Sequence, residues 1–115
     1  MKIIKKIIIV LFLLYASSIY VFADTMRDLE IAGEMLEIAE YGAKASWTAD
    51  ELENLEKLAS EFTDNGLAQI WTANIVLYSL TSQSPQCDIA KENISRLSDE
   101  NLKSIWEQNY NLYGC

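Results

Sequence analysis

Four glutamates recur at intervals of three or four residues early in the chain, at Glu30, Glu34, Glu37 and Glu40. Paired carboxylates can perform acid–base catalysis or bind calcium, but both uses need side chains that converge on one point, usually around a loop. On one straight helix, carboxylates at this spacing point outward side by side. We therefore interpret them as a solvated acidic surface, on which Glu30, Glu34 and Glu37 are candidate contacts for another protein.

The residue types that most catalytic chemistry requires are missing. The chain contains no histidine, which removes the commonest general base and the side chain that titrates near neutral pH. Two cysteines without histidine do not supply the four ligands of a zinc site. No glycine-rich phosphate loop or nucleophile elbow occurs. We expect no enzyme activity, cofactor or metal ion; an enzyme built on carboxylates alone would need two of them facing each other across a cleft.

Cys87 and Cys115 are the only cysteines and lie 28 positions apart. In a small exported domain, two thiols are expected to form a disulfide. If the last two helices form a short antiparallel hairpin around Ser98, the start of the first lies beside the end of the second, and the two cysteines occupy those positions. We predict a disulfide that joins Cys87 to Cys115 and holds this hairpin together.

A sixteen-residue segment occurs twice at a constant offset of 35 residues. Residues 63–78 read TDNGLAQIWTANIVLY and residues 98–113 read SDENLKSIWEQNYNLY. A fixed period between about 20 and 50 residues is typical of stacked helical units. Because the shared apolar residues recur at helical spacing, we expect most of what the repeat preserves to be core. Seven positions are identical: Asp64/Asp99, Leu67/Leu102, Ile70/Ile105, Trp71/Trp106, Asn74/Asn109, Leu77/Leu112 and Tyr78/Tyr113.

Two polar residues of the repeat, Asn74 and Asn109, each lie at the centre of an apolar stripe. A buried amide is costly unless its hydrogen bonds are satisfied. One interpretation is an interhelical hydrogen bond, to a backbone carbonyl or a nearby tyrosine, that fixes the register of the helices. The other is an exposed surface on which amide and aromatic side chains hold a partner's backbone. The sequence leaves both interpretations open.

The remaining candidate partner-binding residues lie where the two copies differ or outside the repeat. Lys103 and Tyr110 stand where the first copy has Ala68 and Ile75, so these positions are not restricted to apolar side chains. Trp47 lies in a turn between helices. It is either a cover over the end of the core or an exposed anchor for a partner.

Apolar spacing predicts five helices, at about residues 25–43, 49–62, 64–80, 85–97 and 99–113. Because one proline and four glycines are the only strong helix breakers, the chain is expected to be all-helical. The expected fold is a small bundle or short solenoid of stacked helical hairpins.

The expected helix starts follow the usual capping patterns. Thr48 and Glu51 have the spacing of a capping box. Thr63 and Ser98 are the expected N-caps of the two repeated helices, and Ser84 before Pro85 is the expected start of the fourth helix.

The two repeated helices differ in their polar residues. No charged residue occurs between Asp64 and Asp88, so the third helix is apolar nearly all round and is expected to be central. The fifth helix is amphipathic, as expected of a terminal unit with a polar outer side.

Residues 1–23 have the pattern of a signal peptide. Lys2, Lys5 and Lys6 precede an apolar run over residues 7–15, and Ala23 ends a motif with small residues at the two positions that a signal peptidase reads. We predict cleavage after Ala23 and export of residues 24–115 as a single domain. An uncleaved anchor is the alternative, and both lead to export because the lysines stay inside. The bacterial periplasm is the preferred location.

Residues 24–115 are strongly acidic. They contain all 17 acidic residues and six of the nine basic ones, giving a formal charge of −11. This charge argues against binding to nucleic acid or to anionic membranes, which both need positive charge. It allows a basic protein partner, and it also serves solubility.

Taken together, these patterns predict an exported, non-enzymatic protein-interaction module. It would act as an assembly factor, an inhibitor or a partner that neutralises an effector, by binding another protein through a helical surface. The alternative function is a small acidic periplasmic stress chaperone whose apolar stripes become exposed when carboxylates are protonated in acid. The sequence specifies neither the partner nor the oligomeric state.

Overall fold

The computed structural model describes residues 19–40 and 46–115, with side chains from residue 23 onward. These residues contain no β-strand. They form five α-helices, which are α2 (Ile19–Ala39), α3 (Ala49–Ala59), α4 (Asn65–Thr81), α5 (Cys87–Ser95) and α6 (Glu100–Leu112). The prediction of an all-α protein with about five helices is confirmed. Residues 1–18, which hold most of the expected signal peptide, lie outside the described residues.

Helix α2 begins and ends earlier than the sequence predicted. It starts at Ile19 rather than Thr25, so the expected cleavage point after Ala23 lies within it. It ends at Ala39 because Glu40 has a φ of 53°, a left-handed conformation that cannot continue a right-handed helix. Ala43, which was expected on the same helix, lies outside the described residues.

The capping box at the start of α3 is confirmed. The Thr48 hydroxyl oxygen accepts a hydrogen bond from the Glu51 N–H at 3.2 Å, and the Glu51 carboxylate accepts one from the Thr48 N–H at 3.0 Å. Each side chain thereby satisfies a backbone donor that the helix itself leaves free.

The predicted N-caps of α4 and α6 are wrong by one residue. Asp64 caps α4, where its carboxylate accepts a hydrogen bond from the Leu67 N–H at 3.1 Å, and Asp99 caps α6 by accepting one from Leu102 at 2.9 Å. A carboxylate combines a good hydrogen-bond acceptor with a charge that suits the positive end of the helix dipole. The hydroxyl of Thr63 is engaged elsewhere, by Asp28.

Helix α5 begins later than predicted. Its N-cap is Gln86 rather than Ser84, and its first helical residue is Cys87. The Gln86 N–H is taken by the carbonyl of Ser79 at 2.9 Å. This bond ties the connection back to α4 and delays the start of α5.

Helix α4 lies at the centre of the molecule, as predicted. Its Trp71 and Ile75 belong to a core cluster with α2 and α3, whereas its Val76 and Leu80 belong to a second cluster with α5. Helix α6 has no fully buried residue and covers the second cluster only through half-buried side chains. It is the outer unit of the stack, as expected.

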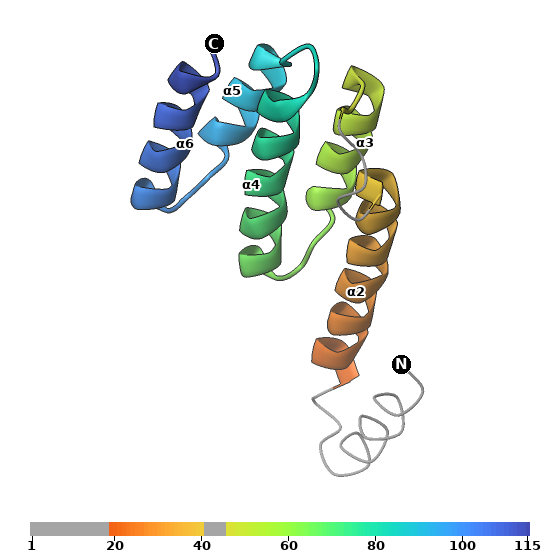
Figure 1. Ribbon diagram of the computed structural model, residues 1–115. Helices are drawn as coiled ribbons and strands as arrows, with labels where there is room; N and C mark the ends of the chain where they lie inside the picture. Colours follow the sequence, from red (N-terminus) through yellow and green to blue (C-terminus); the bar gives the residue numbers. More distant parts are fainter. Residues whose placement is uncertain (1–18, 41–45) are drawn as a thin grey trace.

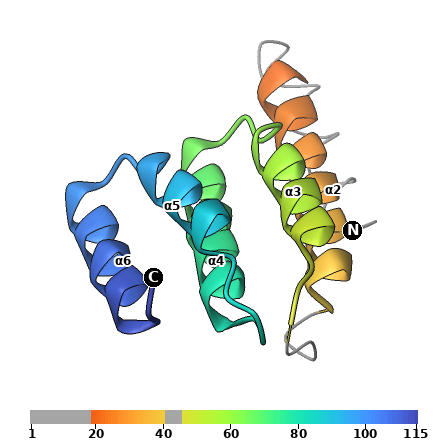
Figure 2. The same ribbon diagram turned by 90° about the horizontal axis from the view of Figure 1, so that it is seen from above.

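The helices follow one another across the molecule, from α2 at one end to α6 at the other (Figure 1). Helices α2, α4 and α6 run in the same direction, and α3 and α5 return between them (Figures 1 and 2). Helices α3 and α5 border a common groove whose floor is α4. They therefore cover one side of the layer formed by α2, α4 and α6, and the opposite side of that layer carries no further described helix.

The predicted disulfide is present. Cys87 at the start of α5 is bonded to Cys115 at the end of the chain, with their Cα atoms 5.6 Å apart. The bond joins the two ends of the α5–α6 hairpin, which explains how an outer helix with little buried surface stays attached.

Candidate functional site

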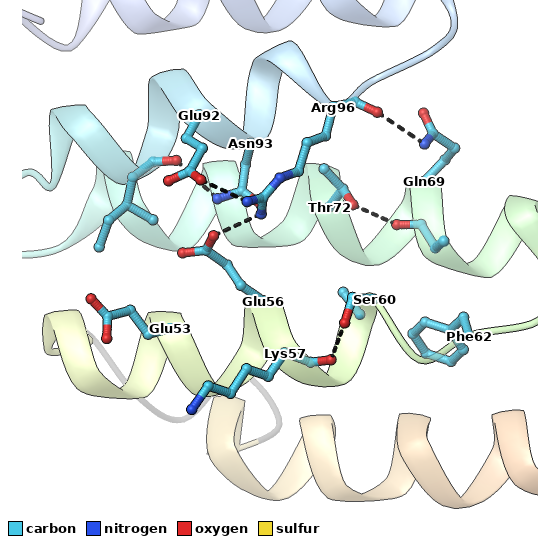
Figure 3. Close-up of a pocket in the computed structure, with 13 residues that line it drawn as sticks. Glu53, Glu56, Lys57, Ser60, Phe62, Gln69, Thr72, Glu92, Asn93 and Arg96 are labelled. Carbon is cyan, nitrogen blue, oxygen red and sulfur yellow. Dashed lines mark hydrogen bonds and ion pairs between the residues drawn. The ribbon is translucent and has the colours of Figure 1, made fainter.

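A groove of about 700 Å³ lies between α3 and α5 and is floored by α4 (Figure 3). We refer to it as the α3–α5 groove. Its floor contains small side chains of α4, among them Ala68 and Thr72, and its rim is charged. The groove exists because α3 and α5 both pack on α4 but are separated from each other across it.

An arginine spans the α3–α5 groove. The Arg96 guanidinium donates to Glu56 of α3 at 2.7 Å and to Glu92 of α5 at 2.7 Å (Figure 3). The buried Asn93 supports this position, because its oxygen accepts from the same guanidinium at 3.4 Å while its amide donates to the Ile89 carbonyl at 2.9 Å. A fully buried amide with both ends bonded orients the arginine toward α3.

Two carboxylates of the groove lie close to each other, the arrangement that catalysis by carboxylates alone would need. Glu56 and Glu92 do approach the groove from opposite sides, but the Arg96 guanidinium lies between them and binds both. No substrate atom can occupy that position without first displacing the arginine. The arrangement is an ion-pair bridge that ties α3 to α5, and it does not favour a reaction at the two carboxylates.

A second polar cluster joins the first half of α2 to the start of α4. Asp28 has only 3% of its surface exposed. Its carboxylate accepts hydrogen bonds from the Thr63 N–H, the Thr63 hydroxyl and the Asp64 N–H at 2.8, 2.8 and 3.0 Å. Burial raises the pKa of Asp28, but these hydrogen bonds and the nearby Arg27 outweigh burial and lower the pKa below its usual value. The cluster is a structural clamp whose strength depends on an ionised carboxylate.

The uncovered side of the α2–α4–α6 layer carries a repeated pattern of exposed apolar residues. Residues at positions i, i+4 and i+7 lie within about 60° of one another around a helix. Three such sets occur here, and in each set the first and last residues are large, apolar and exposed. We call these nine residues the open face: Leu29, Gly33 and Leu36 on α2, Ile70, Asn74 and Leu77 on α4, and Ile105, Asn109 and Leu112 on α6.

The packing places the three sets on the same side of the layer. The buried residues of α4 face its neighbours and lie around the rest of the helix circumference, among them Trp71, Val76 and Ser79. They leave the side of the helix that carries Ile70 uncovered. On α6, Trp106 and Tyr110 pack inward, at the angular positions that Trp71 and Ile75 occupy on α4. On α2, the buried Ile31 and Met35 lie on the side away from Leu29 and Leu36. In each of the three helices, which run in the same direction (Figure 1), the open-face residues therefore lie on the side away from the packed residues.

The exposure of the open face corrects an expectation from the sequence. The repeat was expected to preserve mostly core, yet Ile70 and Ile105 are 58% and 53% exposed, and Leu112 is 81% exposed. Trp71, by contrast, is buried as expected. The apolar surface shared by the two copies is wide enough that neighbouring helices cover one part of it and leave the other part exposed. The sequence does not show where this covering ends. The signal that was missed is the Ile–Asn–Leu set at i, i+4 and i+7 in both copies.

The hydrogen-bonded interpretation of the two asparagines does not fit the structure. Asn74 and Asn109 are half-buried, and within the part of the chain that the structure describes neither amide makes a side-chain hydrogen bond. Both lie between the large apolar residues of the open face.

Trp47 is part of the core rather than an exposed anchor. It is 7% exposed and stacks on Tyr78 with ring centroids 4.3 Å apart. Its backbone N–H donates to the Ser82 hydroxyl at 3.0 Å, which fixes the connection between α2 and α3 beside the end of α4. Burial also raises the pKa of Tyr78. Of the two interpretations of Trp47, the structure supports the cover over the end of the core.

The other sequence-predicted contact residues do not form one site. Lys103 and Tyr110 line a hollow of about 340 Å³ between α5 and α6. Glu30, Glu34 and Glu37 are exposed on α2, at the opposite end of the molecule (Figure 1). A single small partner could not contact both groups at once.

The described residues form neither a cluster of metal ligands nor a membrane-spanning helix. Among the described residues, no group of three or more cysteine, aspartate or glutamate side chains could hold a metal ion. No helix within residues 19–40 or 46–115 is long and apolar enough to cross a bilayer.

Comparison with known proteins finds no match: no family model, no curated protein sequence and no solved structure is significantly similar to this chain.

Proposed function

We propose that this chain is an exported, non-enzymatic protein-interaction module that binds a segment of another protein on its open face. One observation carries the proposal: six large apolar side chains are exposed at equivalent positions of three parallel helices. Scattered exposed apolar residues are ordinary, but a contiguous apolar patch on an otherwise polar surface marks an interaction site.

The charge distribution strengthens the proposal. The chain has 17 acidic residues, yet none of the nine open-face positions is charged. Asn74 and Asn109 provide the few polar groups that orient a ligand on an apolar surface.

Export is supported by the basic and apolar leader in the sequence and by the disulfide between Cys87 and Cys115. Disulfides persist in oxidising compartments and are rare in the cytosol. The periplasm of a bacterium is the compartment that fits a short leader of this kind and a small domain with one disulfide.

Affinity capture from the native compartment tests the proposal. The wild-type protein is expected to recover a stoichiometric partner, and the double variant Ile70→Ala, Ile105→Ala is expected to recover at least tenfold less of it. Alanine keeps these exposed helical positions uncharged and favourable for the helix, so circular dichroism should be unchanged. Failure to capture any stoichiometric partner, or equal capture by both proteins, would contradict the proposal.

A second candidate function, an acid-activated chaperone, is favoured by the Asp28 clamp. Protonation of Asp28 would weaken the junction between α2 and α4 and expose apolar surface of the first core cluster. A light-scattering assay with an aggregating client protein separates the two functions. A chaperone would suppress aggregation at about pH 2 to 4 and not at neutral pH, whereas an interaction module would bind its partner at neutral pH.

A further inference from the structure

We propose that the segment bound on the open face is a basic amphipathic helix of another protein. This inference rests on the proposed function and adds the chemistry of the partner. Its apolar stripe would contact the Ile and Leu side chains of α4 and α6, and its Lys and Arg residues would lie against the acidic edge at which these helices begin.

The structure separates positive charge from the open face. Lys57 and Arg96 line the α3–α5 groove, and Lys91 and Lys103 line the hollow between α5 and α6. Arg27 is paired with Glu61 beyond the end of α3, at 3.3 Å. The described basic residues thus lie toward α3 and α5, so none of them would repel a positively charged segment on the opposite side of the layer.

Negative charge borders the open face instead. Asp64 and Asp99, the N-caps of α4 and α6, are exposed at the edge where these helices begin, next to the exposed Glu100. Asp24 and Asp64 also line a hollow of about 290 Å³ between the first half of α2 and the start of α4, and Leu29 of the open face lines the same hollow. Each capping carboxylate more than offsets the partial positive charge of its helix end, so this edge attracts cations.

The open face suits a helix better than an extended peptide. An extended peptide needs partners for its backbone N–H and C=O groups, and the open face offers only the amides of Asn74 and Asn109. A helix satisfies its own backbone and needs only apolar contact. The Ile70–Leu77 and Ile105–Leu112 pairs are each about 10.5 Å long at helical rise, which matches the i, i+7 spacing on a partner helix.

The same charges disfavour the other occupants of this surface. A second copy of the chain docked face to face gains nothing from the acidic edge. If the copies are parallel, the two acidic edges meet, and like charges at an interface are costly. If they are antiparallel, no described basic residue of the second copy lies on the open face to pair with the acidic edge. An anionic membrane surface would be repelled by the acidic edge. A basic helix is the occupant that gains from both the apolar face and its border.

The test uses two synthetic peptides with the same leucines at helical spacing. In one peptide all the remaining positions are lysine, and in the other they are all glutamate. Binding to the protein is measured by isothermal titration calorimetry at low salt and at about 0.5 M NaCl. The lysine peptide is expected to bind at least tenfold more tightly than the glutamate peptide, and the difference is expected to shrink at high salt.

Two double variants locate the site. Ile70→Ala with Ile105→Ala is expected to weaken binding of the lysine peptide at least tenfold without changing the fold. Glu53→Gln with Lys57→Gln leaves the net charge unchanged and alters only the rim of the α3–α5 groove, so it is expected to bind like the wild type. Equal affinity for the two peptides, or loss of binding only in the groove variant, would overturn the inference.

The outcomes for the proposed function and for this inference are distinct. Capture of a native partner that depends on Ile70 and Ile105, together with no preference for the lysine peptide, would leave the function standing and refute a basic helix. Dimers in sedimentation that the Ile70→Ala, Ile105→Ala variant abolishes would identify a second copy as the occupant. Binding to vesicles of phosphatidylglycerol through the same residues would identify a lipid surface and would also refute it.

Discussion

Asp28 shows how one buried carboxylate holds two helices together. It lies in α2, and its hydrogen bonds go to the backbone and hydroxyl at the start of α4. Three donors converge on one charge, so its ionised form is favoured despite burial. Asp28 therefore links the protonation state of a single group to the packing of the first core cluster.

We predict that Asp28→Asn lowers the free energy of unfolding at pH 7 by about 1.5 to 3 kcal/mol, because hydrogen bonds to a charged acceptor are lost. The pKa of Asp28 is lower in the folded protein than in the unfolded chain. The stabilisation that Asp28 gives the fold is therefore fully present at a pH above its unfolded-state pKa, and it is lost as the pH falls through its folded-state pKa. Urea unfolding at neutral pH and at acid pH would measure the difference between wild type and variant. An undiminished difference at a pH at which the wild-type carboxyl is protonated would contradict this account; Glu30→Gln, at an exposed position, is the control.

Gly33 provides a second residue-scale test. It lies within α2 on the open face, and a Cβ added there would meet no atom within 4 Å. Glycine in a helix interior costs about 1 kcal/mol relative to alanine, so Gly33→Ala should raise the melting temperature by about 4 to 8 °C.

Gly114 is the contrasting position for that experiment. Its φ of +86° is a conformation that suits glycine, so Gly114→Ala should lower the melting temperature. A stabilised Gly114→Ala variant, or a destabilised Gly33→Ala variant, would contradict this role of the two backbone conformations.

Among the elements, the α5–α6 hairpin depends most on a covalent bond. Helix α6 contributes only half-buried side chains to the second core cluster, so its apolar contacts hold it less strongly than those of α4. The disulfide between Cys87 and Cys115 closes the hairpin at the ends opposite its loop. At the loop itself, the Gln69 side chain of α4 donates to the Arg96 carbonyl and accepts from the Ser98 N–H.

We predict that Cys87→Ser or Cys115→Ser lowers the free energy of unfolding by about 3 to 4 kcal/mol, the chain-entropy value for a loop of this length. The bond spans 28 residues. Thermal unfolding of each variant, and of the wild type with and without reductant, would measure the effect. An unchanged melting temperature on reduction would mean that α6 is held by its apolar contacts alone.

At the scale of the whole molecule, acidic charge and apolar surface are kept apart. The outer side of α2 carries Glu30, Glu34 and Glu37, and exposed Glu100 and Glu107 lie on α6 at the other end of the stack. Stacked helical units expose their terminal faces to further stacking unless those faces are polar. The charged residues therefore keep further copies from stacking on the two ends of the molecule, while the open face between them is apolar.

We predict that this acidic surface destabilises the fold at low ionic strength through self-repulsion. Raising NaCl from about 0.02 M to about 0.5 M at pH 7 should therefore raise the melting temperature, because the screening length falls below the spacing between surface charges. The bridge from Arg96 to Glu56 and Glu92 acts in the opposite direction. A melting temperature that falls with salt would show that this bridge outweighs the general repulsion.

Local sequence patterns predicted the helices well and their first residues less well. The capping box at Thr48 was confirmed because both partners lie within one turn. The N-caps at Thr63 and Ser98 were misplaced by one residue because the adjacent carboxylate caps the helix in each case. At Thr63 the hydroxyl is also bound elsewhere, by Asp28, which is 35 residues away in the chain.

The sequence by itself determined the helical content, the central place of α4 and the pairing of the two cysteines. These depend on the spacing of apolar residues within a helix and on the antiparallel order of two adjacent helices. Only the tertiary structure decided that Trp47 is core and that Ile70, Leu77, Ile105 and Leu112 are exposed. The physical reason is that a helix shows an apolar stripe in its sequence whether a neighbour covers that stripe or not. Where α3 and α5 cover α4, the stripe is core; where no described helix covers it, the same kind of residue forms the surface proposed to bind a partner.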